Sequence, residues 1–155
     1  MGAIMSKLLA CFCLFLSLLS YQSVCQAAMD LEDINGHKIA LSSLHGKWVF
    51  INYWASWCGP CVNEISELNS FANNHADNVE VFAVNFDSTS LPKQRRLVKD
   101  FAIEYPSLNP RSLKSLHLDN ISVVPVTYVF DPNGNLNTTL YGGQTERSLQ
   151  ELVSG

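Results

Sequence analysis

Two apolar stretches separated by a helical pattern constrain the fold of this chain more than any other feature. The first is KWVFINYW at residues 47–54, which is apolar on both faces, and the second is VEVFAVNF at 79–86. Strands of this kind are typical of a parallel sheet that helices cover on both sides. Between them, apolar residues recur at helical spacing, and polar residues fall elsewhere on the wheel: Val62, Ile65, Leu68, Phe71 and Ala72 against Glu64, Glu67, Asn69 and Asn73. The pattern predicts a strand–helix–strand unit.

The flanking segments predict further elements of one mixed sheet. Asn35-Gly36, within 29–47, is a strong short-range signal for a β-hairpin. The run VVPVTYVF at 123–130 predicts a strand, followed by the turn DPNGN and a partner strand LNTTLY. Thr145 can cap a last short helix. We expect an α/β fold in which a mixed central sheet is flanked by helices and carries an N-terminal β-hairpin extension.

The region between the second and third predicted strands gives weaker signals. A second helix is expected there, with an apolar and a basic face: Leu97, Val98, Phe101 and Ala102 against Lys93, Arg95, Arg96 and Lys99. Residues 104–122 contain Pro106 and Pro110 and suggest only a short strand and a short helix around Leu113 and Leu116. No internal repeat or low-complexity linker divides the chain, so 29–155 is expected to form one domain.

Residues 1–28 differ in kind from the rest of the chain. Lys7 precedes LLACFCLFLSLLS, and the small-residue stretch SVCQAA follows. The apolar run from residue 8 to 20 is short for a bilayer span, which needs about 20 residues. The layout predicts a signal peptide cleaved after Ala27 or Ala28, and an uncleaved leader that anchors the protein in the membrane is the alternative. The expected location is the periplasm or cell envelope.

The leader also decides the cysteine count of the mature domain. Cys11, Cys13 and Cys25 leave with it, so Cys58 and Cys61 remain from the five that the sequence encodes. Lipidation of a leader cysteine is disfavoured. Cys11 has no sufficient apolar region before it, and Cys25 follows Gln-Ser-Val, which fits a lipoprotein signal badly. The whole chain has a formal charge of −4 and no long run of basic residues, which makes nucleic acid a poor partner.

Cys58 and Cys61 could bind a metal, form a permanent staple or exchange disulfides. Structural zinc needs four ligands, and the mature chain offers no second CxxC and no HxxxH pair, although transient copper binding by the dithiol stays open. A bridge across two residues closes a very small loop and removes little entropy from the unfolded chain. Redox exchange has positive support, because Cys58 begins a helix, where free N–H groups and the helix dipole favour a thiolate. Pro60 suits the first turn of that helix.

The motif WCGPC at 57–61, after an apolar strand and before an amphipathic helix, resembles the thioredoxin superfamily, and Val124-Pro125 resembles its cis-proline loop. The leader, ALSSLHGKWVFINYWASWCGPC and the long segment before Pro125 resemble the exported TlpA-like branch, which includes thiol reductases serving cytochrome c maturation. The resemblance implies that Cys58 attacks and Cys61 resolves. A trans proline at the start of a strand is the alternative for Pro125.

The same resemblance implies a substrate-binding rim around the cysteines, formed by Trp57, Gly59, Pro60, Val124 and Pro125. No bound cofactor and no metal are implied. The other aromatic residues nearby are expected in the core: Trp48, Tyr53 and Trp54.

One position departs from the thioredoxin pattern. Thioredoxins carry a buried aspartate six residues before the first cysteine, where this chain has Asn52. An amide cannot transfer a proton at physiological pH. Proton transfer to Cys61 would then use water or another carboxylate, with Asp87 and Glu80 as candidates.

These observations predict an exported thiol-disulfide oxidoreductase, most simply a dithiol reductase of disulfide-containing client proteins in cytochrome c maturation or disulfide repair. A reductase in an oxidising compartment needs electrons, so a membrane-bound thiol reductant is the expected partner. The alternatives are a copper-binding or client-binding module without turnover, and a dithiol oxidase. A peroxidase is less favoured, because the chain has no Thr-x-x-Cys motif with a partner arginine.

Overall fold

The computed structural model describes residues 30–154 apart from 88, 117, 119 and 120, and the predicted leader lies outside these residues. The elements follow one another in the order β1 (Asp30–Glu32), β2 (Lys38–Ala40), η2 (Leu41–Leu44), β3 (Trp48–Trp54), α2 (Gly59–Asn74), β4 (Val79–Asn85), α3 (Leu91–Asp100), β5 (Ser107–Leu108), η3 (Ser112–Leu116), β6 (Val126–Phe130), β7 (Leu136–Tyr141) and α4 (Glu146–Ser154). In the part of the chain that is described, no helix is long and apolar enough to cross a bilayer.

The central sheet has five strands in the order β5-β4-β3-β6-β7. β3 and β4 are parallel along their whole length, from the pair Trp48–Val79 to the pair Trp54–Asn85. β5 is parallel to β4, whereas β6 and β7 are antiparallel to their neighbours. The predicted strand–helix–strand unit and the mixed sheet are therefore confirmed. So is the N-terminal hairpin of β1 and β2, whose turn contains Gly36 at a φ of 91°.

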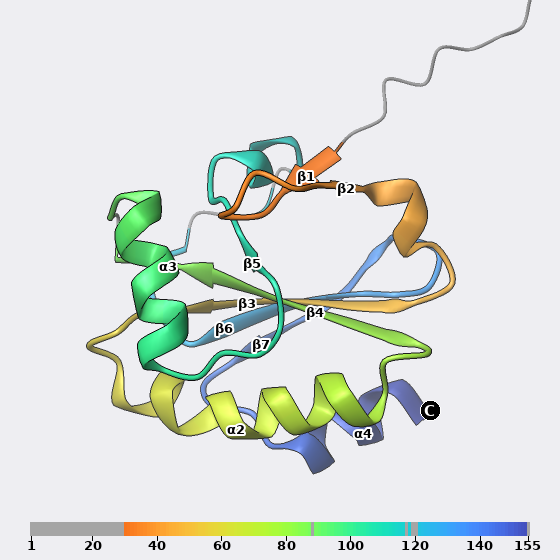
Figure 1. Ribbon diagram of the computed structural model, residues 1–155. Coiled ribbons are helices and arrows are strands. Elements are labelled where there is room, and N and C mark those ends of the chain that lie inside the picture. The colour runs from red at the N-terminus through yellow and green to blue at the C-terminus, as the bar shows by residue number, and fades with distance from the viewer. Residues whose placement is uncertain (1–29, 88, 117, 119–120, 155) are drawn as a thin grey trace, which may run out of the picture.

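The two faces of the sheet are covered differently (Figure 1). Helices α2 and α4 lie along one face, and the β1–β2 hairpin with η2 and η3 lies over the other. Apolar side chains of α3 pack into the core of the first face, together with Phe50, Leu68 and Phe71. The second core is built around Leu31 of the hairpin, which is fully buried. Short elements, rather than long helices, thus cover the second face.

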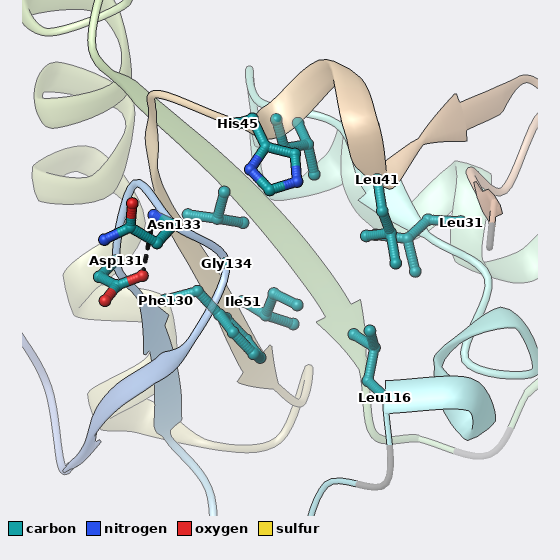
Figure 2. Close-up of a pocket in the computed structure, with 11 residues that line it drawn as sticks. Leu31, Leu41, His45, Ile51, Leu116, Phe130, Asp131, Asn133 and Gly134 are labelled. Atoms are coloured by element: carbon teal, nitrogen blue, oxygen red, sulfur yellow. Dashed lines mark hydrogen bonds between the residues drawn. The ribbon is translucent and has the colours of Figure 1, made fainter. Parts of the chain in front are cut away.

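An apolar cavity of about 210 Å³ lies between the sheet and the N-terminal extension, which consists of the β1–β2 hairpin and η2 (Figure 2). Leu31, Leu41 and Ile51 line it, while His45, Asp131 and Asn133 lie together at one end. The Asn133 backbone N–H donates to Asp131 Oδ1 at 2.9 Å and holds the β6–β7 turn in place. Neither Cys58 nor Cys61 lines this cavity, so it is separate from the candidate redox pair.

Candidate active site

The two cysteines lie where β3 ends and α2 begins. Cys58 is the residue that caps the N-terminus of α2, with Pro60 in the first turn, and its sulfur is bonded to that of Cys61. Cys58 Sγ also accepts a hydrogen bond from the Cys61 backbone N–H at 3.2 Å. Since the first N–H groups of a helix have no partner within it, this sulfur satisfies one of them. The same N–H and the helix dipole will stabilise a Cys58 thiolate once the disulfide is reduced.

The exposure of the two sulfurs is unequal. Cys61 is completely buried, whereas Cys58 keeps 6% of its surface and is preceded by Trp57, which is 69% exposed. Gly59 and Pro60 are also exposed. A disulfide of this kind can be reached only through Cys58, which gives the two cysteines different access to a partner sulfur.

The loop before β6 closes the site from the other side. The Val124–Pro125 peptide bond is cis, and the Val124 carbonyl oxygen lies 3.6 Å from Cys58 Sγ. The Gly142 backbone N–H donates to the Pro125 carbonyl at 3.0 Å, which ties the end of β7 to this loop. Trp57, Gly59 and Pro60 flank Cys58 in the chain, and the contact of Val124 with Cys58 Sγ brings the Val124–Pro125 loop to the same place.

A buried carboxylate lies on the inward-facing side of α2, the helix that begins at the two cysteines. Glu64 is only 3% exposed, and its Oε1 accepts from Asn52 Nδ2 at 2.9 Å while its Oε2 accepts from the Gln144 backbone N–H at 2.8 Å. Asn52 Nδ2 also donates to Thr127 Oγ1 at 3.0 Å. Burial raises the pKa of Glu64, and the hydrogen bonds from Gln144 and Asn52 oppose that rise. A carboxyl group with a raised pKa, one helical turn after Cys61, is suited to proton transfer.

The sequence pattern placed Glu64 outside the apolar face of its helix, and that prediction is wrong. Glu64 lies three residues after Cys61 and four before Leu68, both fully buried, so it shares their side of α2. Its burial is tolerated because Asn52 and Gln144 donate hydrogen bonds to its two oxygens, and Asn52 in turn donates to Thr127. The spacing from Cys61 was the signal in the sequence that could have found it.

The two carboxylates predicted for proton transfer are placed differently by the structure. Glu80 faces Val49 near the start of β3, at the opposite end of the sheet from Cys58, and Lys47 Nζ lies 3.2 Å from its Oε2. That location removes Glu80 as a candidate. Asp87 is nearer to the redox pair, since its Oδ2 accepts a hydrogen bond from the backbone N–H of Ser56 at 3.1 Å. That bond stabilises the turn before Cys58 and does not involve Cys61.

Two further aromatic residues near the CxxC motif, Trp54 and Tyr53, pack edge-to-face on other aromatic rings. Trp54 is buried and packs edge-to-face on Phe101 with ring centroids 5.3 Å apart. Tyr53 packs in the same way on Tyr128, and burial, together with the neighbouring Tyr128, raises the pKa of Tyr53 to about 12. Within the described parts of 30–154, no group of three or more His, Cys, Asp or Glu side chains could hold a metal ion.

Comparison with known proteins agrees with this geometry. The model of the AhpC/TSA family matches residues 24–139. The thiol-disulfide oxidoreductase ResA of Bacillus subtilis is 30% identical over 125 residues, which cover 80% of this chain and 69% of ResA. The thioredoxin-like protein YneN of the same organism is 32% identical over 127 residues, or 80% and 74% of the two chains.

A solved structure shows the same fold. The exposed lipoprotein thioredoxin Etrx1 of Streptococcus pneumoniae superposes with a TM-score of 0.70 at 23% identity, over 81% of this chain and 96% of Etrx1. The five-stranded mixed sheet and its helices are thus thioredoxin-like, and the Cys58–Cys61 pair occupies the junction of β3 and α2. This chain therefore belongs to the AhpC/TSA family, as a thioredoxin-like thiol-disulfide oxidoreductase of the TlpA-like branch.

Proposed function

We propose that this oxidoreductase is an exported dithiol reductase of disulfide-bonded client proteins, in cytochrome c maturation or disulfide repair. One observation carries the proposal: the two sulfurs are unequal in both exposure and electrostatics. Cys58 keeps 6% of its surface exposed, caps a helix and accepts the Cys61 N–H at 3.2 Å, whereas Cys61 is completely buried. This asymmetry supports one direction of attack, from Cys58 onto the client.

The exchange proceeds in two balanced steps. The Cys58 thiolate attacks one sulfur of the client disulfide, so that a Cys58–client bond forms and the other client sulfur leaves with the electron pair. The Cys61 thiolate then attacks Cys58 Sγ, which releases the second client thiolate and leaves Cys58–Cys61 oxidised. Before that second attack Cys61 must lose its proton, and Glu64 is the buried base in this part of the protein.

The client is expected to lie across Trp57 and the loop at Val124. Trp57 offers a large exposed apolar surface beside Cys58, and the Val124 carbonyl lies close to the reacting sulfur. A backbone carbonyl at that place can accept a hydrogen bond from an extended client segment. Gly59 and Pro60 leave the space in front of Cys58 open, because neither carries a long side chain.

Two further parts of the proposal concern the electron supply and the location. A reductase that works outside the cytoplasm must be reduced again, and we assign this to a membrane-bound thiol reductant. The apolar leader at residues 1–28 supports export, whether it is cleaved or kept as an anchor. The structural relative Etrx1, an exposed lipoprotein, points to the same side of the membrane.

The direction of electron flow is tested by the redox state of Cys58 and Cys61 in living cells. Acid quenching followed by alkylation with a mass-shifting thiol reagent separates the reduced from the oxidised pair. We expect a mostly reduced pair that becomes oxidised when membrane thiol reductants are deleted. A pair that stays oxidised in wild-type cells, together with a reduction potential near the oxidising end of the range, about −120 mV, would identify a dithiol oxidase instead.

A further inference from the structure

The two oxygens of the Glu64 carboxylate have different surroundings. Oε1 accepts a hydrogen bond from Asn52 Nδ2, and Asn52 is only 1% exposed, so this oxygen is directed at the core. Oε2 accepts the Gln144 backbone N–H at 2.8 Å, in the loop between β7 and α4. Gln144 is half-buried, and Gly143 beside it is exposed. One oxygen of a buried carboxylate therefore lies directly beneath a surface loop.

Gly143 covers this oxygen without a side chain. An ideal Cβ at position 143 would lie 4.0 Å from Glu64 Oε2 and 3.6 Å from the Pro60 carbonyl oxygen. Both are ordinary van der Waals distances, so a side chain would fit there and would rest on the carboxylate. In the described part of the chain Oε2 accepts one hydrogen bond, that of Gln144, whereas a carboxylate oxygen can accept two. The space that a side chain would fill is left to solvent.

The backbone does not require glycine at position 143. The preceding Gly142 has a φ of 83°, in the left-handed region that favours glycine. The φ of Gly143 lies outside that region. The two glycines therefore differ in what their missing side chains do. At position 143, the contacts that glycine avoids are those with Glu64 and Pro60.

The other neighbours of Glu64 cannot carry its proton away. Asn52 and Thr127, from β3 and β6, have no proton to exchange at neutral pH. Tyr105 precedes β5, and burial, together with the charge of Glu64, raises the pKa of its hydroxyl above 10, so it stays protonated. Cys61, on the same side of α2, is the group that gives up the proton. Solvent at the Gly143 loop is the acceptor that remains.

We propose that Gly143 is a positioning residue of the redox reaction, whose missing side chain lets water contact Glu64 Oε2 and receive the proton that Glu64 takes from Cys61. The proposal rests on the role of Glu64 in the proposed function. In this step the Cys61 S–H bond breaks and its electron pair stays on sulfur, which then bonds to Cys58. The proton moves to the Glu64 carboxylate and from there to water.

The first test is a titration of the Glu64 carboxyl carbon by NMR in the oxidised protein, where neither cysteine titrates. A side chain at position 143 displaces water from Oε2, and loss of water disfavours the charged carboxylate. We expect the titration midpoint to rise by about half a pH unit with Gly143→Ala and by about one unit with Gly143→Val. Gly59→Ala is the matched control, because its Cβ would have no atom within 4 Å, and it should leave the midpoint unchanged.

The second test follows the attack of Cys61. The Cys58 thiolate of the reduced protein attacks dithiobis(nitrobenzoate), and a first thionitrobenzoate leaves. The Cys61 thiolate then attacks Cys58 Sγ, and a second thionitrobenzoate leaves with the electron pair of the broken bond. The pH profile of this second release should contain an inflection from Glu64, which Gly143→Val moves to higher pH. Glu64→Gln should remove the inflection, and Gly143→Val should then have no further effect on the profile.

Three results would overturn the inference. One is the same midpoint and inflection in the parent protein and in both Gly143 variants. Another is an effect of Gly143→Val that persists together with Glu64→Gln, because it would reflect disturbed packing at Pro60. The third is an inflection that survives Glu64→Gln, which would also refute the role of Glu64.

The two Gly143 variants and the two assays keep these outcomes separate. Gly143→Ala places its Cβ at ordinary contact distances, so it decides the question even if Gly143→Val does not fold. The NMR midpoint in the oxidised protein does not depend on the direction of electron flow. A reduced parent protein that never releases the second thionitrobenzoate would refute the resolving step of the proposed function, whereas an unchanged midpoint would refute the role of Gly143 alone.

Discussion

Asn52→Asp is the substitution that tests most sharply how the buried carboxylate is held. Asn52 Nδ2 lies 2.9 Å from Glu64 Oε1, and the two side chains are 1% and 3% exposed. The variant replaces the donor by a second carboxylate at hydrogen-bond distance from the first. Two buried carboxylates so close cannot both ionise, so they share a proton and the pKa values of the pair are driven apart.

The sign of the effect on stability follows from the raised pKa. Below the unfolded pKa of about 4, both groups are protonated in either state, and an O–H···O bond can replace the lost N–H···O bond, so the variant should be nearly as stable as the parent. As the pH rises through the raised folded pKa, that stability is lost. At neutral pH the pair must either keep a proton well above the unfolded pKa or bury a second charge, and either cost should lower the free energy of unfolding by about 3 kcal/mol or more.

The assay is urea unfolding of the oxidised protein, followed by tryptophan fluorescence, at about pH 3.5 and about pH 7.5. The control combines Asn52→Asp with Glu64→Gln, which exchanges donor and acceptor. In this double variant the new amide can donate to the new carboxylate and still accept the Gln144 N–H, so the stability at neutral pH should return. If Asn52→Asp has the same pH dependence as the parent protein, or if the double variant gives no recovery, the reasoning about this pair is wrong.

Three further predictions address the redox pair, its rim and the N-terminal extension. Cys58→Ser should abolish insulin reduction, while Cys61→Ser should trap mixed disulfides visible by mass spectrometry; full turnover by the latter would reverse the assigned roles. Trp57→Ala should leave the unfolding curve unchanged, because the ring is 69% exposed, yet raise the KM for insulin and not for bis(2-hydroxyethyl) disulfide; an equal effect on both substrates would argue against a protein-binding rim. Leu31→Ala should cost about 2–5 kcal/mol, since this side chain is fully buried in the second core; urea unfolding with a smaller loss would mean that the hairpin contributes little to the fold.

Local signals in the sequence were sufficient for the parts of the site that are close in the chain. The run at 47–54, the two cysteines and the amphipathic pattern after them predict the junction of β3 and α2, because strand and helix periodicity and capping depend on neighbouring residues. The position of Cys58 at a helix N-terminus follows from the same local order. The structure bears this out in the capping of α2 by Cys58.

The contacts that complete the site join residues far apart in the sequence. Glu64 meets Asn52 and Gln144, and Asn52 meets Thr127, only because β3, β6 and the loop before α4 pack against α2. From helical periodicity alone, a glutamate such as Glu64 is assigned to the polar, solvent-facing side of its helix. Choosing among Glu64, Glu80 and Asp87 therefore required the tertiary structure.

The redox chemistry could be inferred without the structure, from two cysteines at the end of an apolar strand, one of them at a helix N-terminus, in a chain with the strand and helix order of a thioredoxin-like domain. These features depend on short-range geometry and composition. Which carboxylate is buried near the sulfurs, and that a hairpin and short 3-10 helices cover the second face, could be learned only from the tertiary structure. Burial and hydrogen-bond satisfaction are properties of packed surfaces, and those surfaces exist only once distant segments have come together.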